Sequence, residues 1–503
     1  MDVRIALEET AVALDEIVVT GVPGAQEKRS IGNVVSTIDA DEIVGKAPVS
    51  SLNELINGRA AGVTILSTTG VVGASSRVTI RGASSFSLSN APLIYVDGIR
   101  VNNDETTGPS NQAFGNQSVS RFNDFDPDNI ESIEIIKGPA AATLYGTEAA
   151  NGVIQIITKK GQAGDTRFHV KIEQGANWFA DPEDRLYTNF GMVDGELQTI
   201  SFTDLAAQEE RLGNPPLFQT GHLQRYDVSA SGGTDLARYF VSAGYERNEG
   251  VEVTNVAETA NGRLNVTVSP NEQWRIGGSV GYVDGRVDLP CEAGCGGNTW
   301  AVFFSTPTNL DGVSRGFTSR TPEFYHTIVQ DWQDVSRFTG SIQLDHTPAS
   351  WFAHGLTFGT DQTHEEDNSL FNRDDRFLDE SSFTGVGSRF IRDRQINYTT
   401  FDYSATGTFD LVEGLASSTS VGAQYYRTHV DRTSAYGEGF PVPGLTSVDA
   451  TTVNKDAGSD FVNNTTVGVY VQEQLSSLDR RFLTFGLRAD DNSAFGENFD
   501  LVY

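Results

Sequence analysis

The chain has 503 residues and a formal net charge of −31, from 36 basic and 67 acidic side chains. It is too long for one ordinary globular core, and a surface this acidic repels phosphate backbones, which excludes nucleic acid as a partner. Aromatic residues make up 10% of the chain and glycines number 51, a composition that fits neither a disordered chain nor a helical bundle. We expect many strands and long polar loops.

Residues 1–30 are predicted to be a tail and a linker, because they show no hydrophobic periodicity. They contain a short β-branched run, Leu14–Gly21, that cannot bury itself. It is either an edge strand or a segment that pairs with a strand of a partner protein. The first residues lack the pattern of a signal peptide, so either the chain is cytoplasmic or its true start is missing.

Residues 31–161 change character and predict a small mixed α/β unit. Ser51 is the expected N-cap of a helix, with Glu54 at the capping-box position. Asp97-Gly98 is a strong hairpin-turn signal and is not expected to act as a catalytic acid. A second helix is predicted after Gly138-Pro139, over residues 140–145. The predicted strands are residues 34–38, 63–66, 78–82, 93–96, 130–136 and 153–158.

From residue 165 onward, about eleven segments alternate apolar and polar residues over roughly ten to fifteen positions. In one of them Tyr239, Val241 and Ala243 share a face, and Ser242 and Gly244 share the other. A soluble sandwich alternates too, but its strands usually have about 5–6 residues. No stretch approaches the ~18 consecutive apolar residues of a membrane helix. The pattern therefore favours an antiparallel transmembrane β-barrel.

The sequence offers little sign of catalytic or metal chemistry. Cys291 and Cys295, the only cysteines, lie in a Gly-rich loop, and we expect one small disulfide in an oxidising compartment. Two free thiols or, less favoured, a metal site are the alternatives. Residues 363–367 do not form a His-Glu-x-x-His motif, so we expect no enzyme activity, cofactor or metal. The acidic stretch 374–380 has oxygen ligands for Ca²⁺ but lacks an ordered spacing, which favours a solvated loop.

Several segments are similar to one known family. Residues 138–161, GPAAATLYGTEAANGVIQIITKKG, closely resemble the plug signature of the SusC/RagA branch of TonB-dependent outer-membrane receptors, as do VTIRG at 78–82 and PLIYVDG at 92–98. Residues 14–21 resemble a TonB box. Residues 3–13 resemble the end of the carboxypeptidase-regulatory-like domain that precedes the box in this branch.

The resemblance implies an α+β plug domain followed by a barrel, in three parts. These are the domain end, TonB box and linker (1–30), the plug (31–161) and the N-terminal half of the barrel (162–503). In the barrel region the match is architectural, apart from the phrase Gly486-Leu487-Arg488. Transporters of this kind close with 22 strands. About eleven segments therefore predict half of a barrel, and a fragment cut at both ends.

The function implied by the resemblance is import of oligomeric nutrients, glycans or peptides, across the outer membrane of a Gram-negative bacterium. The plug gates the lumen and TonB supplies the energy. A SusD-like surface lipoprotein and outer-membrane lipid are the further expected partners. The alternatives are a siderophore or cobalamin receptor of the same fold, and a non-transporting surface sensor or adhesion relative. Fold alone does not choose between them.

The resemblance also assigns two sites on the N-terminal side. The residues expected to bind TonB are Asp15, Glu16, Ile17, Val18, Val19, Thr20 and Gly21. Arg81 and Gly82 match the arginine–glycine motif of the plug, whose arginine is expected to bond to barrel carboxylates and lock the plug in place. An ordinary solvated arginine is the alternative.

Substrate contacts are expected at the plug apex. Aromatic rings there can stack on sugar rings, and amide side chains can bond to hydroxyl groups. The alternative is that these residues belong to loops without a binding role. The expected contact residues are Phe86, Asn90, Asn102, Asn103 and Phe122.

Overall fold

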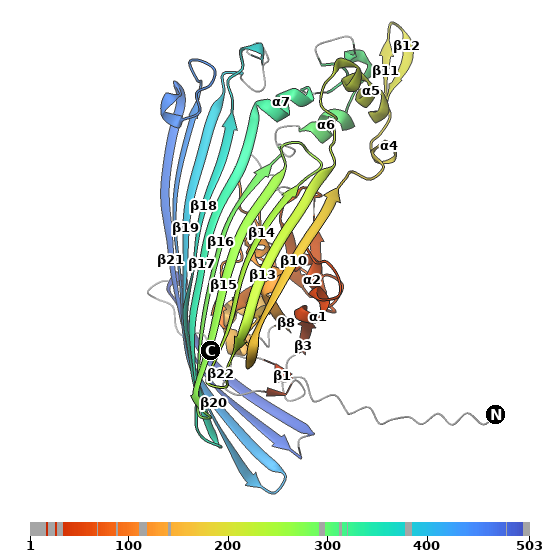
Figure 1. The fold of residues 1–503 in the computed structure, drawn as a ribbon. Coiled ribbons are helices and arrows are strands. Elements are labelled where there is room, and N and C mark those ends of the chain that lie inside the picture. The colour runs from red at the N-terminus through yellow and green to blue at the C-terminus, as the bar shows by residue number, and fades with distance from the viewer. Residues whose placement is uncertain are drawn as a thin grey trace, which may run out of the picture.

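The computed structural model contains a small N-terminal α/β unit and a large curved sheet that wraps around one side of it (Figure 1). It describes residues 17–18, 26–27, 34–67, 69–86, 89–109, 118–138, 142–290, 297–310, 314–318, 320–377, 385–478 and 480–495. The arrangement confirms the predicted fold class, an α+β unit followed by an antiparallel sheet of barrel type. No helix in these ranges has the length and apolar character needed to span a bilayer.

The N-terminal unit is built around a mixed five-stranded sheet. Its strands are β3 (Val34–Asp39), β6 (Leu93–Val96), β7 (Ile99–Arg100), β8 (Ile130–Lys137) and β9 (Val153–Thr158). Their order is β3-β8-β9-β6-β7, and only β6 and β9 run parallel. The other elements are β1 (Ile17–Val18), β2 (Gln26–Glu27), α1 (Ala40–Val44), α2 (Leu52–Ile56), β4 (Val63–Ser67), β5 (Ser76–Ile80), α3 (Ala142–Tyr145) and the 3-10 helices η3 (Arg121–Asp124), η4 (Pro127–Asn129) and η6 (Thr147–Asn151).

Local sequence signals set the ends of these elements. Ser51 caps α2, because its hydroxyl accepts the backbone N–H of Glu54 at 3.3 Å. The Glu54 carboxylate accepts the N–H of Ser50 instead of Ser51, so the predicted capping box is displaced by one residue. Asp97 and Gly98 have positive φ angles of 46° and 82°, the geometry of a tight hairpin turn between β6 and β7.

The large sheet contains eleven antiparallel strands, which confirms the predicted count of about eleven segments. The strands are β10 (Gly164–Asn177), β13 (Gly221–Gly233), β14 (Ala237–Glu249), β15 (Val256–Asn271), β16 (Trp274–Leu289), β17 (Val329–Ala349), β18 (Phe352–Phe371), β19 (Ser388–Val412), β20 (Leu415–Glu438), β21 (Val453–Ser477) and β22 (Arg481–Asn492). Each pairs with its neighbour in this order, and β10 and β22 are the outermost strands of the described sheet. Short 3-10 helices lie at η8 (Asp375–Phe377), η9 (Val448–Ala450) and η10 (Ser493–Phe495).

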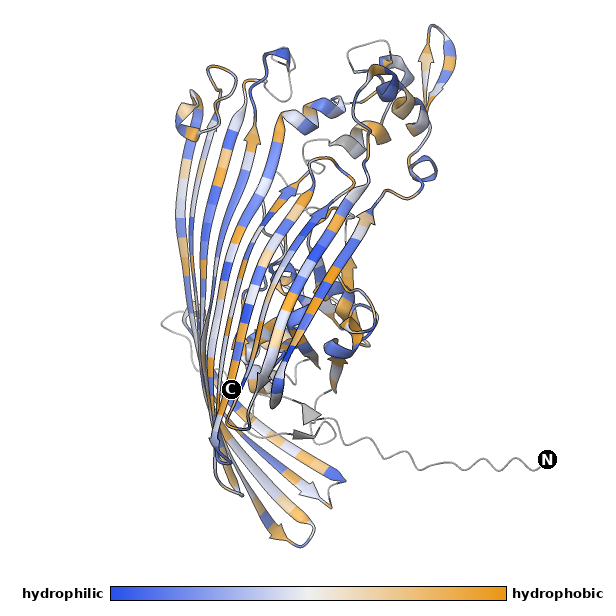
Figure 2. Ribbon diagram, in the orientation of Figure 1, coloured by the Kyte–Doolittle hydropathy of each residue, from blue (hydrophilic) through white to orange (hydrophobic). Residues whose placement is uncertain are grey.

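The two faces of the large sheet differ in polarity, because hydrophobic and hydrophilic residues alternate along its strands (Figure 2). The outer face carries exposed apolar side chains, such as Val467, Val469 and Val471 in β21. The face toward the N-terminal unit carries buried charged side chains, such as Asp361 and Glu365 in β18. An apolar exterior around a polar interior is the pattern of a transmembrane barrel.

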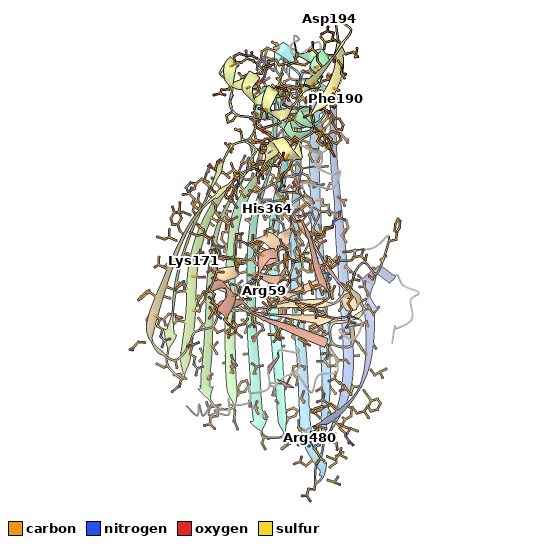
Figure 3. All side chains as sticks on the ribbon, turned by 90° about the vertical axis from the view of Figure 1, so that its right-hand side faces the viewer. Arg59, Lys171, Phe190, Asp194, His364 and Arg480 are labelled. Atoms are coloured by element: carbon orange, nitrogen blue, oxygen red, sulfur yellow. The ribbon has the colours of Figure 1, made fainter. Side chains whose placement is uncertain are left out.

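The turns at one end of the large sheet are short, whereas two long loops at the other end form a folded cluster (Figure 1). Figure 3 labels Phe190 and Asp194 in this loop cluster and Arg480 at the opposite end. The cluster has its own hydrophobic core, which includes Leu205 and Phe324. The sequence predicted only polar loops here. The elements of the cluster are α4 (Pro182–Arg185), β11 (Asn189–Val193), β12 (Glu196–Ile200), α5 (Phe202–Leu212), α6 (Asn298–Phe303), η7 (Pro307–Asn309) and α7 (Pro322–Thr327).

Candidate functional site

The N-terminal unit is held against strands β17 and β18 by a buried network of charges. Arg337 of β17 is 2% exposed, and its guanidinium donates to both carboxylate oxygens of Asp361 in β18, at 2.8 and 3.1 Å. The same group donates to the Asp124 carboxylate at 3.0 Å and to the backbone carbonyls of Arg121 and Asn102. Each guanidinium nitrogen therefore has a partner, which a buried charge requires.

A second arginine extends the network from the N-terminal unit. Arg121 of η3 forms an ion pair with Glu365 of β18 at 3.2 Å and donates to Gln333 of β17 at 2.6 Å. Arg394 of β19 also binds Glu365, at 2.8 Å, and reaches Asp104 of the N-terminal unit at 2.5 Å. Positive and negative groups thus alternate across this contact. Removing one of them leaves a buried charge without its partner.

A second contact lies on strands β10 and β13. Asp126, Asp128 and Asp227 form the one group of three carboxylates within the described ranges that lies close enough to share a metal ion. Arg225 pairs with all three of them, and Lys171 pairs with Asp128 at 2.9 Å. The carboxylates are therefore bound by basic side chains of the chain itself. The contact joins two aspartates of the N-terminal unit to the large sheet.

A third contact involves strands β20 and β22. Arg488 of β22 donates to the backbone carbonyl of Leu144 at 3.1 Å. Tyr95 of β6 meets Tyr426 of β20 edge to face, with ring centroids 6.3 Å apart. Burial raises the pKa of Tyr95 to about 12, so its hydroxyl keeps its proton at neutral pH. Arg488 belongs to the Gly-Leu-Arg phrase that the sequence analysis singled out.

Between these contacts the N-terminal unit and strands β13–β17 line an open cavity of about 470 Å³. The cavity lies toward the end of the sheet that bears the loop cluster. Its wall is somewhat more polar than apolar, which suits a hydrated or hydroxyl-rich solute better than a purely apolar one. The polar residues that line it include Asn53, Glu54, Asn123, Glu246, Asn248 and Arg286.

Arg81 and Gly82, the predicted plug lock, lie together at the end of β5 with positive φ angles of 61° and 85°. Both residues are exposed, and the N–H of Arg81 donates to the carbonyl of Gly62 at 2.7 Å. The Arg81 guanidinium lies against Gly138. Within the described residues no ion pair joins Arg81 to a carboxylate of the sheet, so its locking role stays a prediction.

The predicted substrate contacts are not gathered on one surface. Phe86 is fully exposed, and the Asn90 side chain accepts hydrogen bonds from its own loop. Asn103 donates to the carbonyl of Pro92 at 2.6 Å. Asn102 is fully buried, and its backbone N–H donates to the wall residue Asp361 at 2.8 Å. Asn102 thus takes part in the contact with the sheet.

Phe122 requires a correction. Its side chain is 2% exposed and packs in the main hydrophobic core of the N-terminal unit. The ring turns inward because η3 begins at Arg121, with the Ser120 hydroxyl accepting the N–H of Phe122. A ring in this position cannot stack on a substrate, and its role is structural.

The predicted TonB-binding segment is described only at Ile17–Val18. These two residues form β1 and pair antiparallel with Gln26–Glu27 of β2. The other five predicted TonB-binding residues lie outside the described residues, as do Cys291 and Cys295. The backbone of Ile17 and Val18 adopts the extended form that strand addition to a partner requires.

Sequence reasoning missed the arginines that join the two units. Arg225, Arg337 and Arg394 each sit at a position where the alternation along a strand requires a residue on the inner face. A basic residue at an inward-facing strand position could have predicted such a contact, because a charge inside a lumen needs an oppositely charged partner. The carboxylates that bind these arginines come from distant segments, so the sequence did not predict which residues pair.

Comparison with known proteins accounts for the two units. The family model described as TonB-dependent Receptor Plug Domain matches residues 27–153. TonB-dependent receptor P26 of Formosa agariphila is 25% identical over 544 residues, covering 99% of this chain and 50% of the relative. TonB-dependent receptor SusC of Bacteroides thetaiotaomicron is 29% identical over 260 residues, covering 50% of this chain and 24% of the relative.

The fold is also found among solved structures. The RagAB peptide importer in its open-open state superposes with a TM-score of 0.76 at 20% identity, over 97% of this chain and 57% of that chain. The chain spans about half the length of TonB-dependent receptor P26, which it matches almost from end to end. The N-terminal unit is thus a plug and the large sheet is part of a barrel wall. Residues 27–153 thus match the plug domain of TonB-dependent receptors, and nearly the whole chain is similar to such receptors, SusC and the RagAB importer among its matches.

Proposed function

We propose that this protein takes part in TonB-energised import of oligomeric nutrients, glycans or peptides, through the outer membrane of a Gram-negative bacterium. The observation that carries the proposal is the buried ionic contact between the plug and strands β17–β19, centred on Arg337 and Glu365. This contact holds a folded domain against the inner face of a barrel wall. A pore closed in this way transports only if the plug moves or rearranges.

Energy for that movement has to reach the plug from outside the barrel. The segment around Ile17–Val18 is suited to receive it, since a β-branched strand can add to the sheet edge of a partner. TonB is the partner proposed here. Pulling on this segment loads β3, the first strand of the plug sheet, which pairs with β8 in the plug interior. The plug thus gates the lumen and TonB supplies the force.

The relatives and the polar cavity support this substrate class. The relatives include SusC, and a similar solved structure is named as a peptide importer. A polar cavity of about 470 Å³ suits the hydroxyl and amide groups of oligosaccharides or peptides. A SusD-like surface lipoprotein is the proposed partner on the side of the loop cluster. Outer-membrane lipid is the proposed surrounding of the apolar face.

A second candidate is a siderophore receptor. It is favoured by matches such as the Rhizobactin receptor of Rhizobium meliloti, 32% identical over 178 residues that cover 35% of this chain. The alignment covers little beyond the plug in length, and plugs are shared across these receptors. Fold and plug therefore do not separate the two candidates.

Uptake assays test the proposal. Cells that express the complete reading frame, with and without a functional TonB, are supplied with labelled oligosaccharides, labelled peptides or a ferric siderophore. The proposal expects TonB-dependent uptake of an oligosaccharide or a peptide. TonB-dependent uptake of the ferric siderophore alone supports the second candidate. Uptake that is equal with and without TonB contradicts the energised mechanism.

A further inference from the structure

Two histidines meet across neighbouring strands on the outer face of the wall. His346 of β17 and His354 of β18 are directly opposed Cα partners in the strand register. The Nδ1 atom of His346 lies 3.0 Å from the Nε2 atom of His354. Both belong to the short-turn end of the sheet, close to the connection that follows Ala349. The pair is independent of the plug contacts described above.

Aromatic rings hold the two imidazoles in place. Trp274 of β16 stacks on His346 with ring centroids 3.9 Å apart and an interplanar angle of 13°. His354 lies beside Phe352 at 5.6 Å and Tyr403 of β19 at 6.0 Å. A ring that is packed on both sides loses little further rotamer freedom when its nitrogen binds a ligand. The pair is therefore largely preorganised.

The separation of the two nitrogens suits a shared metal ion. Two imidazole nitrogens at the usual 2.0–2.1 Å from a tetrahedral ion lie about 3.3 Å apart. The two nitrogens of His346 and His354 are 3.0 Å apart, a few tenths of an ångström less, and both rings have to turn so that the nitrogens face a common ion. Without an ion, the N–H group of one imidazole donates a hydrogen bond to the facing nitrogen of the other. Binding an ion requires the donor imidazole to carry its proton on its other ring nitrogen instead, so that both facing nitrogens are free. Two metal–nitrogen bonds then replace the hydrogen bond, with no net release of a proton from the two neutral imidazoles.

Two other histidines of the large sheet have carboxylate partners. His364 pairs with Asp393 at 2.5 Å and His429 with Asp431 at 2.9 Å. Figure 3 labels His364, which lies on β18 farther from the short turns than His354. Each of these histidines offers a single imidazole. They serve as matched controls for the pair.

We propose that His346 and His354 form a cross-strand binding site for a divalent transition-metal ion. The ligand chemistry selects Cu²⁺, Ni²⁺ or Zn²⁺ over Ca²⁺ or Mg²⁺, because imidazole nitrogen suits the first group and the second prefers oxygen. The ion cross-links β17 and β18, the two strands that also carry Arg337 and Asp361, so its binding stabilises this part of the wall.

Metal titration of the purified protein in detergent micelles tests the proposal. Ni²⁺ alone is the probe in calorimetry, and Cu²⁺ alone is the probe in electron paramagnetic resonance, where nitrogen couplings report the number of bound imidazoles. We expect one saturable site with two coupled nitrogens. In His346→Asn and His354→Asn the affinity falls by about tenfold or more, since losing even an outer-shell partner costs a metal site that much. His364→Asn and His429→Asn keep the wild-type affinity.

Two results overturn the proposal. One is the absence of saturable Ni²⁺ and Cu²⁺ binding to the wild-type protein. The other is binding that survives in both variants of the pair, or that is lost in a control variant instead. Near-wild-type melting of each variant without metal shows that it has folded. If a variant of the pair does not fold, the number of coupled nitrogens in the wild-type Cu²⁺ spectrum still decides the outcome.

Discussion

Arg337 and Asp361 form a two-point ion pair between neighbouring strands of the wall, and the plug covers both of them. The pair is also bonded to the plug, because Asp361 accepts the N–H of Asn102 while Arg337 donates to Asp124. Plug and wall therefore share one buried network. The strength of this contact determines how firmly the plug is held.

Removing the arginine tests the network. Arg337→Met leaves Asp361 and Asp124 buried without their cation, and we expect a loss of about 3–5 kcal/mol in the free energy of unfolding. Thermal and denaturant unfolding in detergent measures it. Arg432→Met is the control, since Arg432 pairs with Asp460 at an exposed site and should change stability by about 1 kcal/mol or less. If the two variants lose equal amounts of stability, the buried network does not stabilise the protein more than an exposed ion pair does.

A glycine in the plug tests how closely its segments pack. Gly152 has a φ of +93°, and a Cβ there would lie 2.8 Å from the carbonyl oxygen of Ile136 and 2.9 Å from Ile80. Gly195, in the β11–β12 turn, has a φ of +85° and open space around it. Gly195→Ala should cost about 1–2 kcal/mol from backbone strain alone. Gly152→Ala should cost about 1–3 kcal/mol more, because the core must also move. A larger loss of unfolding free energy in Gly195→Ala than in Gly152→Ala would refute the close packing around Gly152.

Two phenylalanines separate a structural role from a binding role. Phe122→Ala removes a ring from the plug core and should lower the free energy of unfolding by about 3–5 kcal/mol. Phe86 is fully exposed, so Phe86→Ala should change stability by about 0.5 kcal/mol or less. If Phe86 contacts the substrate, its loss weakens binding without affecting the melting temperature. A normal melting temperature for Phe122→Ala would show that the ring is not in the core.

The stability of the plug should depend on the protonation of Glu105. Burial raises the pKa of Glu105, although the Val78 N–H and Arg77 act in the opposite direction. The protonated carboxyl adds stability that is fully present below the unfolded pKa, about 4.3. That stability is lost as the pH rises through the folded pKa. Glu105→Gln stays neutral, so its melting temperature relative to that of the wild type should rise as the pH rises above about 4.3, the unfolded pKa of the glutamate. A pH-independent difference rules out this assignment.

Much of the fold was predictable because its signals are local. Alternation placed Tyr239, Val241 and Ala243 on one face of a strand, and β14 confirms that pattern. Asp97-Gly98 predicted its turn from residue type alone. The predicted capping box was wrong by one residue: the Glu54 carboxylate accepts the backbone N–H of Ser50, not that of Ser51. Two adjacent serines offer Glu54 two neighbouring backbone donors. Element boundaries of this kind depend on local geometry that the sequence leaves open.

The contacts between units were not predictable in the same way. Arg337 lies 213 residues from Asp124 in the sequence, and only the docked plug brings them together. Phe122 was misassigned, because an aromatic residue in a polar stretch looks exposed until η3 turns its ring inward. The core of the loop cluster joins Leu205 to Phe324 across two separate loops. No periodic pattern connects such positions.

The most direct test of the account is the effect of Val18→Pro on the complete protein in cells. Proline removes the backbone N–H and blocks strand addition at the predicted TonB box. We expect Val18→Pro to abolish nutrient uptake while substrate binding at the cell surface stays at the wild-type level. Val18→Thr keeps a β-branched strand and should retain uptake. Wild-type uptake by Val18→Pro, with normal expression, would contradict the proposal that TonB drives transport through this segment.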